Sequence, residues 1–174
     1  MTEFEFPWEY NFPPFFTLQK HTETRKQQIS RWKELILSYA KQNNQAVINI
    51  NDESELFSNS KINRTLDREL REVILTELCK TKNAELVGGK NSGTYELYWL
   101  TVDEWSNVIY SWAVNSGMTN SVLTFFELLN GDDTRDQQFY QLNEQVFMKA
   151  LKHLEGKGKC EVMEIDGNYG VKFF

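Results

Sequence analysis

The feature of this sequence that most constrains its fold is an internal repeat of apolar residues at helical spacing. Six apolar positions in residues 29–40 recur, position for position, 73 residues further along the chain. The first set is Ile29, Trp32, Leu35, Ile36, Tyr39 and Ala40, and the second is Val102, Trp105, Val108, Ile109, Trp112 and Ala113. Apolar residues at intervals of three and four lie along one face of a helix. The repeat therefore predicts two similar units that each open with a long amphipathic helix, the first one from Thr22.

The repeat continues into a second helix in each unit. At an offset of 76 residues, the apolar positions of residues 66–78 correspond to those of residues 142–154. Asp67 and Asn143 each follow the leucine that opens this stretch. A short acceptor side chain at that place can satisfy the free amides of a starting helix. We therefore expect a second amphipathic helix in each unit, with Asp67 and Asn143 as its N-terminal caps.

Turn-forming residues after each second helix predict a β-hairpin. In the first unit, residues 85–87 and 94–100 flank the glycine-rich run 88–93. In the second unit, residues 160–165 and 169–174 flank Asp166-Gly167-Asn168. Glycine and asparagine supply the positive φ angles that tight hairpin turns require. Each unit therefore ends in a hairpin.

The order of the predicted elements indicates a fold. Short β-prone pieces lie between the helices, at residues 46–50 and 121–124, and a middle helix is expected after each, at 125–130 in the second unit. Helix, short strand, helix, helix and hairpin is the order of a winged helix, a small helical bundle with a projecting hairpin. We expect an α+β fold, mostly α with small β-hairpins, in two tandem winged-helix domains. The boundary near Thr101 gives residues 1–100 and 101–174.

The charge balance argues against nucleic acid as the main partner. The formal net charge of −6 divides into −1 for residues 1–100 and −5 for residues 101–174. Proteins that bind duplex DNA need clustered Lys and Arg. In residues 67–82, Arg68 and Arg71 alternate with acidic residues, which favours pairing within the helix over contact with phosphates. A winged-helix DNA-binding or transcription-associated protein is therefore the alternative function and not the preferred one.

No residue pattern typical of an enzyme, a metal site or a cofactor site stands out. The sequence lacks a glycine-rich phosphate loop, a nucleophile elbow and histidines at metal spacing. His153 is expected to be a solvated position, and the acidic residues 132–136 lack the glycine and final glutamate of an EF-hand. Cys79 and Cys160 lack paired spacing, which favours a reducing, cytoplasmic setting. We expect no catalysis, no cofactor, no metal and, for want of a long apolar run, no transmembrane helix.

A segment dense in aromatic residues and proline precedes the first helix. Seven of the thirteen residues from Phe4 to Phe16 are aromatic. The paired Pro13 and Pro14 favour polyproline II and remove two backbone donors, so we expect the segment to stay extended. Its aromatic side chains could fill pockets on a partner, at about 1.5–3 kcal/mol each when fully buried.

Two interpretations of these aromatic residues compete. They could fold back over their own domain, and Trp8 and Phe12 are the candidates for that. Left in water, so many aromatic side chains would form an exposed patch of the kind that marks interaction sites. We therefore favour docking onto another protein for the segment as a whole.

Several motifs resemble those of the vacuolar protein-sorting subunit 25 family, the small subunit of the endosomal sorting complex ESCRT-II. The resemblance covers nearly the whole chain. Its strongest marks are Trp8 with the run Phe12-Pro13-Pro14-Phe15-Phe16-Thr17-Leu18-Gln19, then Asn120-Ser121-Val122 with Glu127-Leu128, and finally Gly170-Val171-Lys172-Phe173-Phe174. Lys20 departs from the family pattern, which often has another proline there.

The resemblance implies a function. It implies a non-enzymatic ESCRT-II subunit that acts in sorting ubiquitinated cargo into multivesicular endosomes, cytoplasmic and recruited to the endosomal membrane. The Pro-Pro-x-aromatic motif makes Pro13, Pro14, Phe15 and Phe16 the expected partner-binding residues, which insert into the two larger subunits, vacuolar protein-sorting subunits 22 and 36. The resemblance further implies two copies per complex and a second domain that recruits an ESCRT-III subunit, vacuolar protein-sorting subunit 20.

Overall fold

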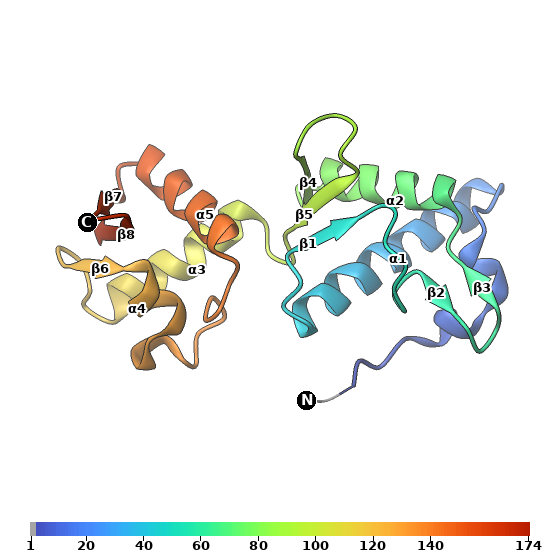
Figure 1. The fold of residues 1–174 in the computed structure, drawn as a ribbon, viewed down its shortest axis with the longest axis horizontal. Coiled ribbons are helices and arrows are strands. Elements are labelled where there is room, and N and C mark those ends of the chain that lie inside the picture. Colours follow the sequence, from blue (N-terminus) through green and yellow to red (C-terminus); the bar gives the residue numbers. More distant parts are fainter. Residues whose placement is uncertain (1–2) are drawn as a thin grey trace. The chain divides into compact units, whose positions relative to one another are not determined.

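The computed structural model describes residues 3–174, which form two compact units (Figure 1). The first unit ends at Trp99, and the second runs from Leu100 to Phe174. Each unit contains a long helix, a second helix and a three-stranded antiparallel sheet.

The first unit places its helices beside a small sheet. Its elements are η1 (Trp8–Asn11), η2 (Pro13–Phe16), α1 (Thr22–Gln42), β1 (Val47–Asn49), β2 (Ser58–Asn59), β3 (Arg64–Thr65), α2 (Arg68–Lys80), β4 (Ala84–Val87) and β5 (Thr94–Leu97). The main sheet has the order β1-β5-β4, and β2 pairs with β3. The helix predicted to start at Thr22 and the hairpin predicted after the second helix are both confirmed.

The core of the first unit lies where α1 packs against α2. The predicted apolar stripe of α1 is buried at Trp32, Leu35, Ile36 and Ala40. The facing stripe of α2 is buried at Leu70, Ile74, Leu75 and Leu78. Burial of these apolar side chains makes the main favourable contribution to the free energy of packing α1 against α2.

The second unit repeats this arrangement. Its elements are α3 (Val102–Asn115), β6 (Val122–Thr124), α4 (Phe125–Asn130), η3 (Asp132–Thr134), α5 (Glu144–Gly156), β7 (Cys160–Ile165) and β8 (Asn168–Phe173). Its sheet has the order β6-β8-β7. A two-residue turn joins β7 to β8, and its residues Asp166 and Gly167 both have positive φ angles, of 52° and 80°. The chain is thus mostly helical with small antiparallel sheets, in two tandem winged-helix domains.

The first unit differs from the prediction in one element. Where the second unit has α4, the described part of the first unit has turns and the short β2–β3 hairpin, so the expected middle helix is wrong there. Residues 51–60 are rich in Asn, Ser and acidic residues, which favour turns because their side chains bond to nearby backbone. The two large apolar side chains in this stretch, Leu56 and Phe57, are nevertheless buried and anchor the turns to the core.

Helix capping also differs between the units. Asn143 caps α5 as predicted, because its side chain accepts hydrogen bonds from the amides of Gln145 and Val146. Asp67 occupies the N-cap position of α2 as predicted, but its side chain makes none of the expected capping bonds. The backbone amide of Asp67 instead donates to the carbonyl of Phe16, which ties the start of α2 to the N-terminal segment.

Candidate docking surface

The N-terminal segment, residues 3–19, is folded against α1 rather than extended. Its two short 3-10 helices, η1 and η2, are consecutive turns, and Pro13 opens η2. The expectation of an extended segment is therefore wrong. The fixed φ of proline, near −65°, suits the first turn of a helix as well as polyproline II, so the sequence alone did not decide between them.

The structure divides the four predicted docking residues into two pairs. Phe15 and Phe16 lie in the core of their own domain, with 6% and 1% of their surface exposed. Phe15 stacks on Trp32 with ring centroids 4.4 Å apart, and Phe16 meets Trp32 edge-on at 5.4 Å. Pro13 is half-buried and Pro14 is exposed. Two of the predicted residues thus hold the segment in place, and two lie toward its outer face.

Trp8 and Phe12, which were expected to fold back over their own domain, are exposed instead. Trp8 is 71% exposed and Phe12 is 47% exposed, so the prediction that they cover their own domain is wrong. Their rings lie 5.8 Å apart on the outside of the segment. The Trp32 surface that could have received them is already occupied by Phe15 and Phe16. We call Trp8, Phe12 and Pro14 the aromatic rim.

A buried glutamine holds the segment to α1. The side-chain amide of Gln28 donates to the carbonyls of Phe15 at 3.0 Å and Thr17 at 2.7 Å, and its oxygen accepts from the amide of Gln19 at 3.1 Å. Trp32 Nε1 adds a bond of 2.8 Å to the Phe15 carbonyl. Gln28 was not among the residues predicted from the sequence; its place four residues before Trp32, on the apolar face of the helix, was the only signal. The rim is therefore held on a fixed backbone.

The aromatic rim borders a shallow hollow of about 520 Å³. Gln27 and Arg31 of α1 line its other side. Arg31 lies 3.5 Å from Glu9, so the charge at this edge is partly balanced. Exposed aromatic rings beside a hollow are typical of a protein-binding surface.

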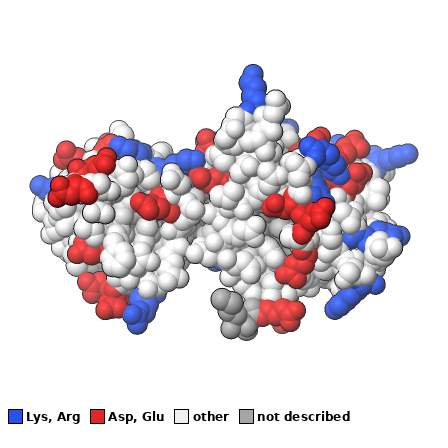
Figure 2. Space-filling view, viewed as in Figure 1, with Lys and Arg blue, Asp and Glu red and all other residues white. Residues whose placement is uncertain are grey.

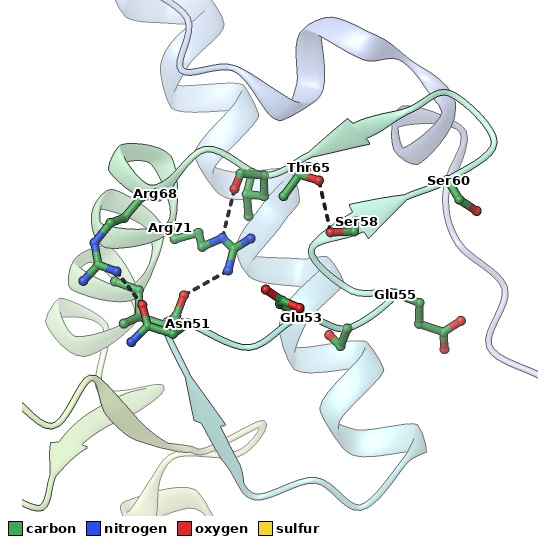
Figure 3. A pocket seen from close by; sticks show the side chains of 11 residues that line it. Asn51, Glu53, Glu55, Ser58, Ser60, Thr65, Arg68 and Arg71 are labelled. Carbon is green, nitrogen blue, oxygen red and sulfur yellow. Dashed lines mark hydrogen bonds between the residues drawn. The ribbon is translucent and has the colours of Figure 1, made fainter.

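A second hollow, of about 850 Å³, surrounds Arg71 and is called the arginine pocket (Figure 3). Arg71 is only 9% exposed. Its Nε donates to the carbonyl of Leu66 at 2.9 Å, and its Nη1 donates to the carbonyls of Ile50 and Asp52, both at 3.0 Å. Its guanidinium also lies 4.5 Å from the centre of the Phe57 ring. The side chain is thus fixed by neutral groups.

Arg71 has no carboxylate partner within the described residues 3–174. The neighbouring Arg68 pairs with Glu72 at 3.3 Å, as predicted, but the expected pairing of Arg71 within the helix is wrong. Burial lowers the pKa of Arg71 and the charge of Arg68 lowers it further, while the nearby carboxylates of Asp52 and Glu53 oppose this shift. Figure 3 shows its guanidinium facing the space bordered by Glu53, Ser58 and Thr65. A buried cation held by neutral groups is a strong attractor for an anionic group from outside.

The arginine pocket adjoins another hollow that the N-terminal segment lines. A smaller hollow is lined by Phe4, Phe6 and Tyr10 of that segment, and it shares Glu55, Ser58 and Ser60 with the arginine pocket. The Tyr10 hydroxyl donates to the carbonyls of Glu55 and Ser58, which joins the two parts.

Comparisons with known proteins identify the family. A sequence model described as ESCRT-II complex subunit matches residues 9–143. Vacuolar protein-sorting-associated protein 25 of Xenopus laevis is 45% identical over 173 residues, covering 98% of this chain and 99% of that protein.

The chain belongs to the ESCRT-II complex subunit family.

Solved structures agree with this membership. The subunit VPS25 of the endosomal trafficking complex ESCRT-II has a TM-score of 0.85 at 25% identity, with 97% of this chain and 98% of that chain covered. A chain in the crystal structure of the endosomal complex ESCRT-II (VPS22/VPS25/VPS36) has a TM-score of 0.83 at 26% identity, with coverage of 96% and 98%. The protein is thus an ESCRT-II subunit in endosomal sorting, a structural component of a complex.

The surface charge of this ESCRT-II subunit does not favour the DNA-binding alternative. On the face drawn in Figure 2, basic and acidic side chains are intermixed and no continuous basic surface forms. In α2, Glu77 pairs with Lys80 at 3.0 Å, in addition to the pair of Arg68 with Glu72. Paired charges of this kind are not available to phosphates.

The second domain of this ESCRT-II subunit has several exposed apolar side chains, which together we call the α4 face. Phe126, in the first turn of α4, is 72% exposed, and Val122 on β6, four residues earlier, is also exposed. Ile165 and Tyr169 are exposed at the tip of the β7–β8 hairpin. The Tyr169 ring lies 5.5 Å from that of Phe125, which links the tip to α4.

The histidine and the cysteine of the second domain that could take part in catalysis or metal binding make structural contacts. His153 Nε2 lies 2.9 Å from the Asp103 carboxylate, so it connects α5 to α3. Burial raises the pKa of the Cys160 thiol to about 11. Among residues 3–174, no three potential metal ligands gather and no helix is long and apolar enough to cross a membrane.

Proposed function

We propose that the first domain attaches this protein to the two larger ESCRT-II subunits, vacuolar protein-sorting subunits 22 and 36, through the aromatic rim and the arginine pocket. The observation that carries the proposal is the rim: Trp8 and Phe12 are largely in water, yet their backbone is fixed by Gln28 and Trp32. A rigid surface loses little conformational entropy on binding. Tryptophan is moreover enriched among the residues that dominate binding energy.

Within this proposal the motif residues have separate roles. The aromatic rim, which includes Pro14, contacts the partner together with the half-buried Pro13. Phe15 and Phe16 act from inside the domain, because their contacts with Trp32 set the position of the segment. This division follows from burial, since a side chain that is 1% exposed cannot reach a partner without unfolding of the segment.

The arginine pocket supplies the polar part of the same interface. A carboxylate of a larger subunit would neutralise Arg71, which has only neutral acceptors in its own domain. The serine and threonine hydroxyls that line the pocket could satisfy the remaining oxygen lone pairs. A carboxylate at this position would add specificity, because Asp52 and Glu53 lie near Arg71 but make no ion pair with it, and its hydrogen bonds all go to neutral carbonyls.

The second domain is proposed to recruit an ESCRT-III subunit, vacuolar protein-sorting subunit 20, through the α4 face. Its net charge of −5 would attract a basic partner, and its exposed apolar side chains would supply the contact area. As a link between the complex core and ESCRT-III, present in two copies per complex, the protein would act without catalysis. Its presence at the endosomal membrane would then follow from its partners.

The first experiment is co-purification with the two larger subunits. The double variant Trp8→Ala/Phe12→Ala should lose assembly while circular dichroism stays native, because both side chains are exposed. Arg71→Gln should weaken assembly as well, and Arg135→Gln is its matched control because Arg135 lies outside the arginine pocket, in the second domain, where it pairs with Asp132. Normal assembly of the Trp8→Ala/Phe12→Ala variant would refute the proposed interface.

The second domain is tested with the complementary variant. Val122→Ala/Phe126→Ala should leave assembly of ESCRT-II intact and lower the affinity for the ESCRT-III subunit by tenfold or more, roughly the effect of losing one buried aromatic anchor. The Trp8→Ala/Phe12→Ala variant, assayed as the free chain, should bind the ESCRT-III subunit normally. If each variant instead lost the other partner, the partners assigned to the aromatic rim and to the α4 face would have to be exchanged.

A further inference from the structure

A groove beside α1 collects positive charge in an otherwise acidic protein. Lys20, Arg25, Lys26 and Lys33 line it, and Glu77 of α2 is the one acidic residue that the described structure places in its wall. Its volume is about 500 Å³. None of these residues belongs to the aromatic rim or to the arginine pocket, so the interface proposed above does not account for the groove.

The positive charges of the groove are not neutralised by the protein. Lys20, Arg25 and Lys33 make no ion pair within residues 3–174. Lys26 has only a 3.7 Å contact with Glu23, and both of those side chains are more than 70% exposed. The acid in the groove wall is itself occupied, because Glu77 lies 3.0 Å from Lys80. The groove therefore has an excess of cationic groups.

These basic residues do not help the helix that carries them. Arg25 and Lys26 lie in the first turns of α1, where the helix dipole favours negative charge. Arg25 and Lys33 both line the groove, about 12 Å apart along α1, so their like charges repel each other weakly. Helix stability thus gives no reason for this clustering, and a bound anion would remove both unfavourable terms.

The shape of the groove indicates the class of anion. From Thr22 to Lys33 the helix rises roughly 16 Å, so the groove is long enough to enclose a compact ring carrying several phosphates but too short to enclose a long polyanion. Thr22 and Ser30 add hydroxyl donors, and the half-buried Ile29 gives an apolar floor on which a ring can rest. Arg25 offers the fork of donors that binds phosphate oxygens in pairs.

We propose that this groove binds a polyphosphorylated inositol head group. The head group could belong to a phosphoinositide in a membrane or to a soluble inositol phosphate, since both present the same phosphates. The site is separate from the subunit interface and does not depend on it.

Binding is tested on the full chain with two probes. One is a vesicle of phosphatidylcholine with a phosphatidylinositol bisphosphate, compared in sedimentation with phosphatidylserine vesicles of equal charge. The other is inositol hexakisphosphate, measured by titration calorimetry. The variant Arg25→Gln/Lys33→Gln should bind either probe roughly 25-fold more weakly, about fivefold for each lost charge. Lys61→Gln/Lys90→Gln, outside the groove, is the charge-matched control and should bind normally.

The two probes distinguish the sources of the head group. Binding of vesicles but not of the soluble phosphate would assign the groove to a membrane, and binding of the soluble phosphate but not of vesicles would assign it to a free ligand. Binding to phosphatidylserine vesicles as tight as binding to the phosphoinositide vesicles, binding of neither probe, tighter binding of duplex DNA, or unchanged affinity of the Arg25→Gln/Lys33→Gln variant would each overturn the proposal. The same variant should still assemble with the larger ESCRT-II subunits, so the two proposals fail independently.

Discussion

At the scale of single residues, the motif Pro13-Pro14-Phe15-Phe16 contains both buried and exposed side chains. In a short 3-10 helix, successive side chains point in different directions, so one can enter the core while its neighbour stays in water. Phe15 and Phe16 are buried, and Pro14 is exposed. The same four residues thus provide both an internal anchor and an external surface.

This division predicts opposite effects of two alanine substitutions. Phe16→Ala should lower the free energy of unfolding by about 3–5 kcal/mol, the usual cost of removing a fully buried phenylalanine. Phe12→Ala should change it by less than about 1 kcal/mol, because much of that ring is already in water. Urea denaturation of the two variants measures the difference, and equal losses of stability would contradict the assignment.

At the scale of elements, α3 and α5 are joined by a cluster of charges as well as by their apolar faces. The carboxylate of Asp103, in the first turn of α3, accepts from His153 at 2.9 Å and from Lys157 at 3.4 Å. These hydrogen bonds, that of His153 first, hold the pKa of Asp103 below its ordinary value of 3.8. His153, expected to be a solvated position, therefore has a structural role between two helices.

The lowered pKa of Asp103 predicts a change of stability in acid. A carboxyl whose pKa is lower in the folded state adds stability above its unfolded pKa, and loses it as the pH falls through the folded value. Asp103→Asn should therefore flatten the dependence of stability on pH below about 4 and leave its shape near neutrality unchanged. Thermal unfolding from pH 7 downward measures this, with Asp133→Asn as a control in an exposed turn. Parallel pH profiles for Asp103→Asn and the native chain would contradict it.

At the scale of the whole molecule, charge is distributed unequally between the domains. The −5 of residues 101–174 contrasts with the −1 of residues 1–100, where acidic and basic side chains nearly balance. The interface proposed for the first domain depends on aromatic contacts and one buried cation. The interface proposed for the second domain combines apolar contacts with long-range attraction.

This asymmetry predicts different responses to salt. Affinity of the second domain for the ESCRT-III subunit should fall several-fold as the salt concentration rises from about 0.05 M to about 0.5 M, because exposed charges are screened. Assembly through the first domain should change much less over the same range. Binding measured by calorimetry at several salt concentrations tests both statements. If the affinity for the ESCRT-III subunit were independent of salt, charge would contribute nothing to this binding, and the apolar contacts of the α4 face would account for it alone.

The sequence by itself determined the repeated framework. The spacing of apolar residues predicts the helices α1, α2, α3 and α5, and turn-forming residues predict the hairpin that ends each unit. Both are local properties of the sequence. The two tandem winged-helix domains could therefore be predicted. The stretch from residue 51 to 60 could not, because its polar residues show no period and its turns are fixed by the burial of Leu56 and Phe57.

Only the tertiary structure decided which side chains are exposed and which are buried. Phe12 and Phe16 are alike in hydrophobicity, and the difference between them is that Trp32, sixteen residues beyond Phe16, receives one of them and not the other. Arg71 and Arg68 are alike in sequence context, yet one is buried among carbonyls from residues 50, 52 and 66 and the other is paired in water. Burial depends on what distant segments bring to a site, and no local pattern contains that information.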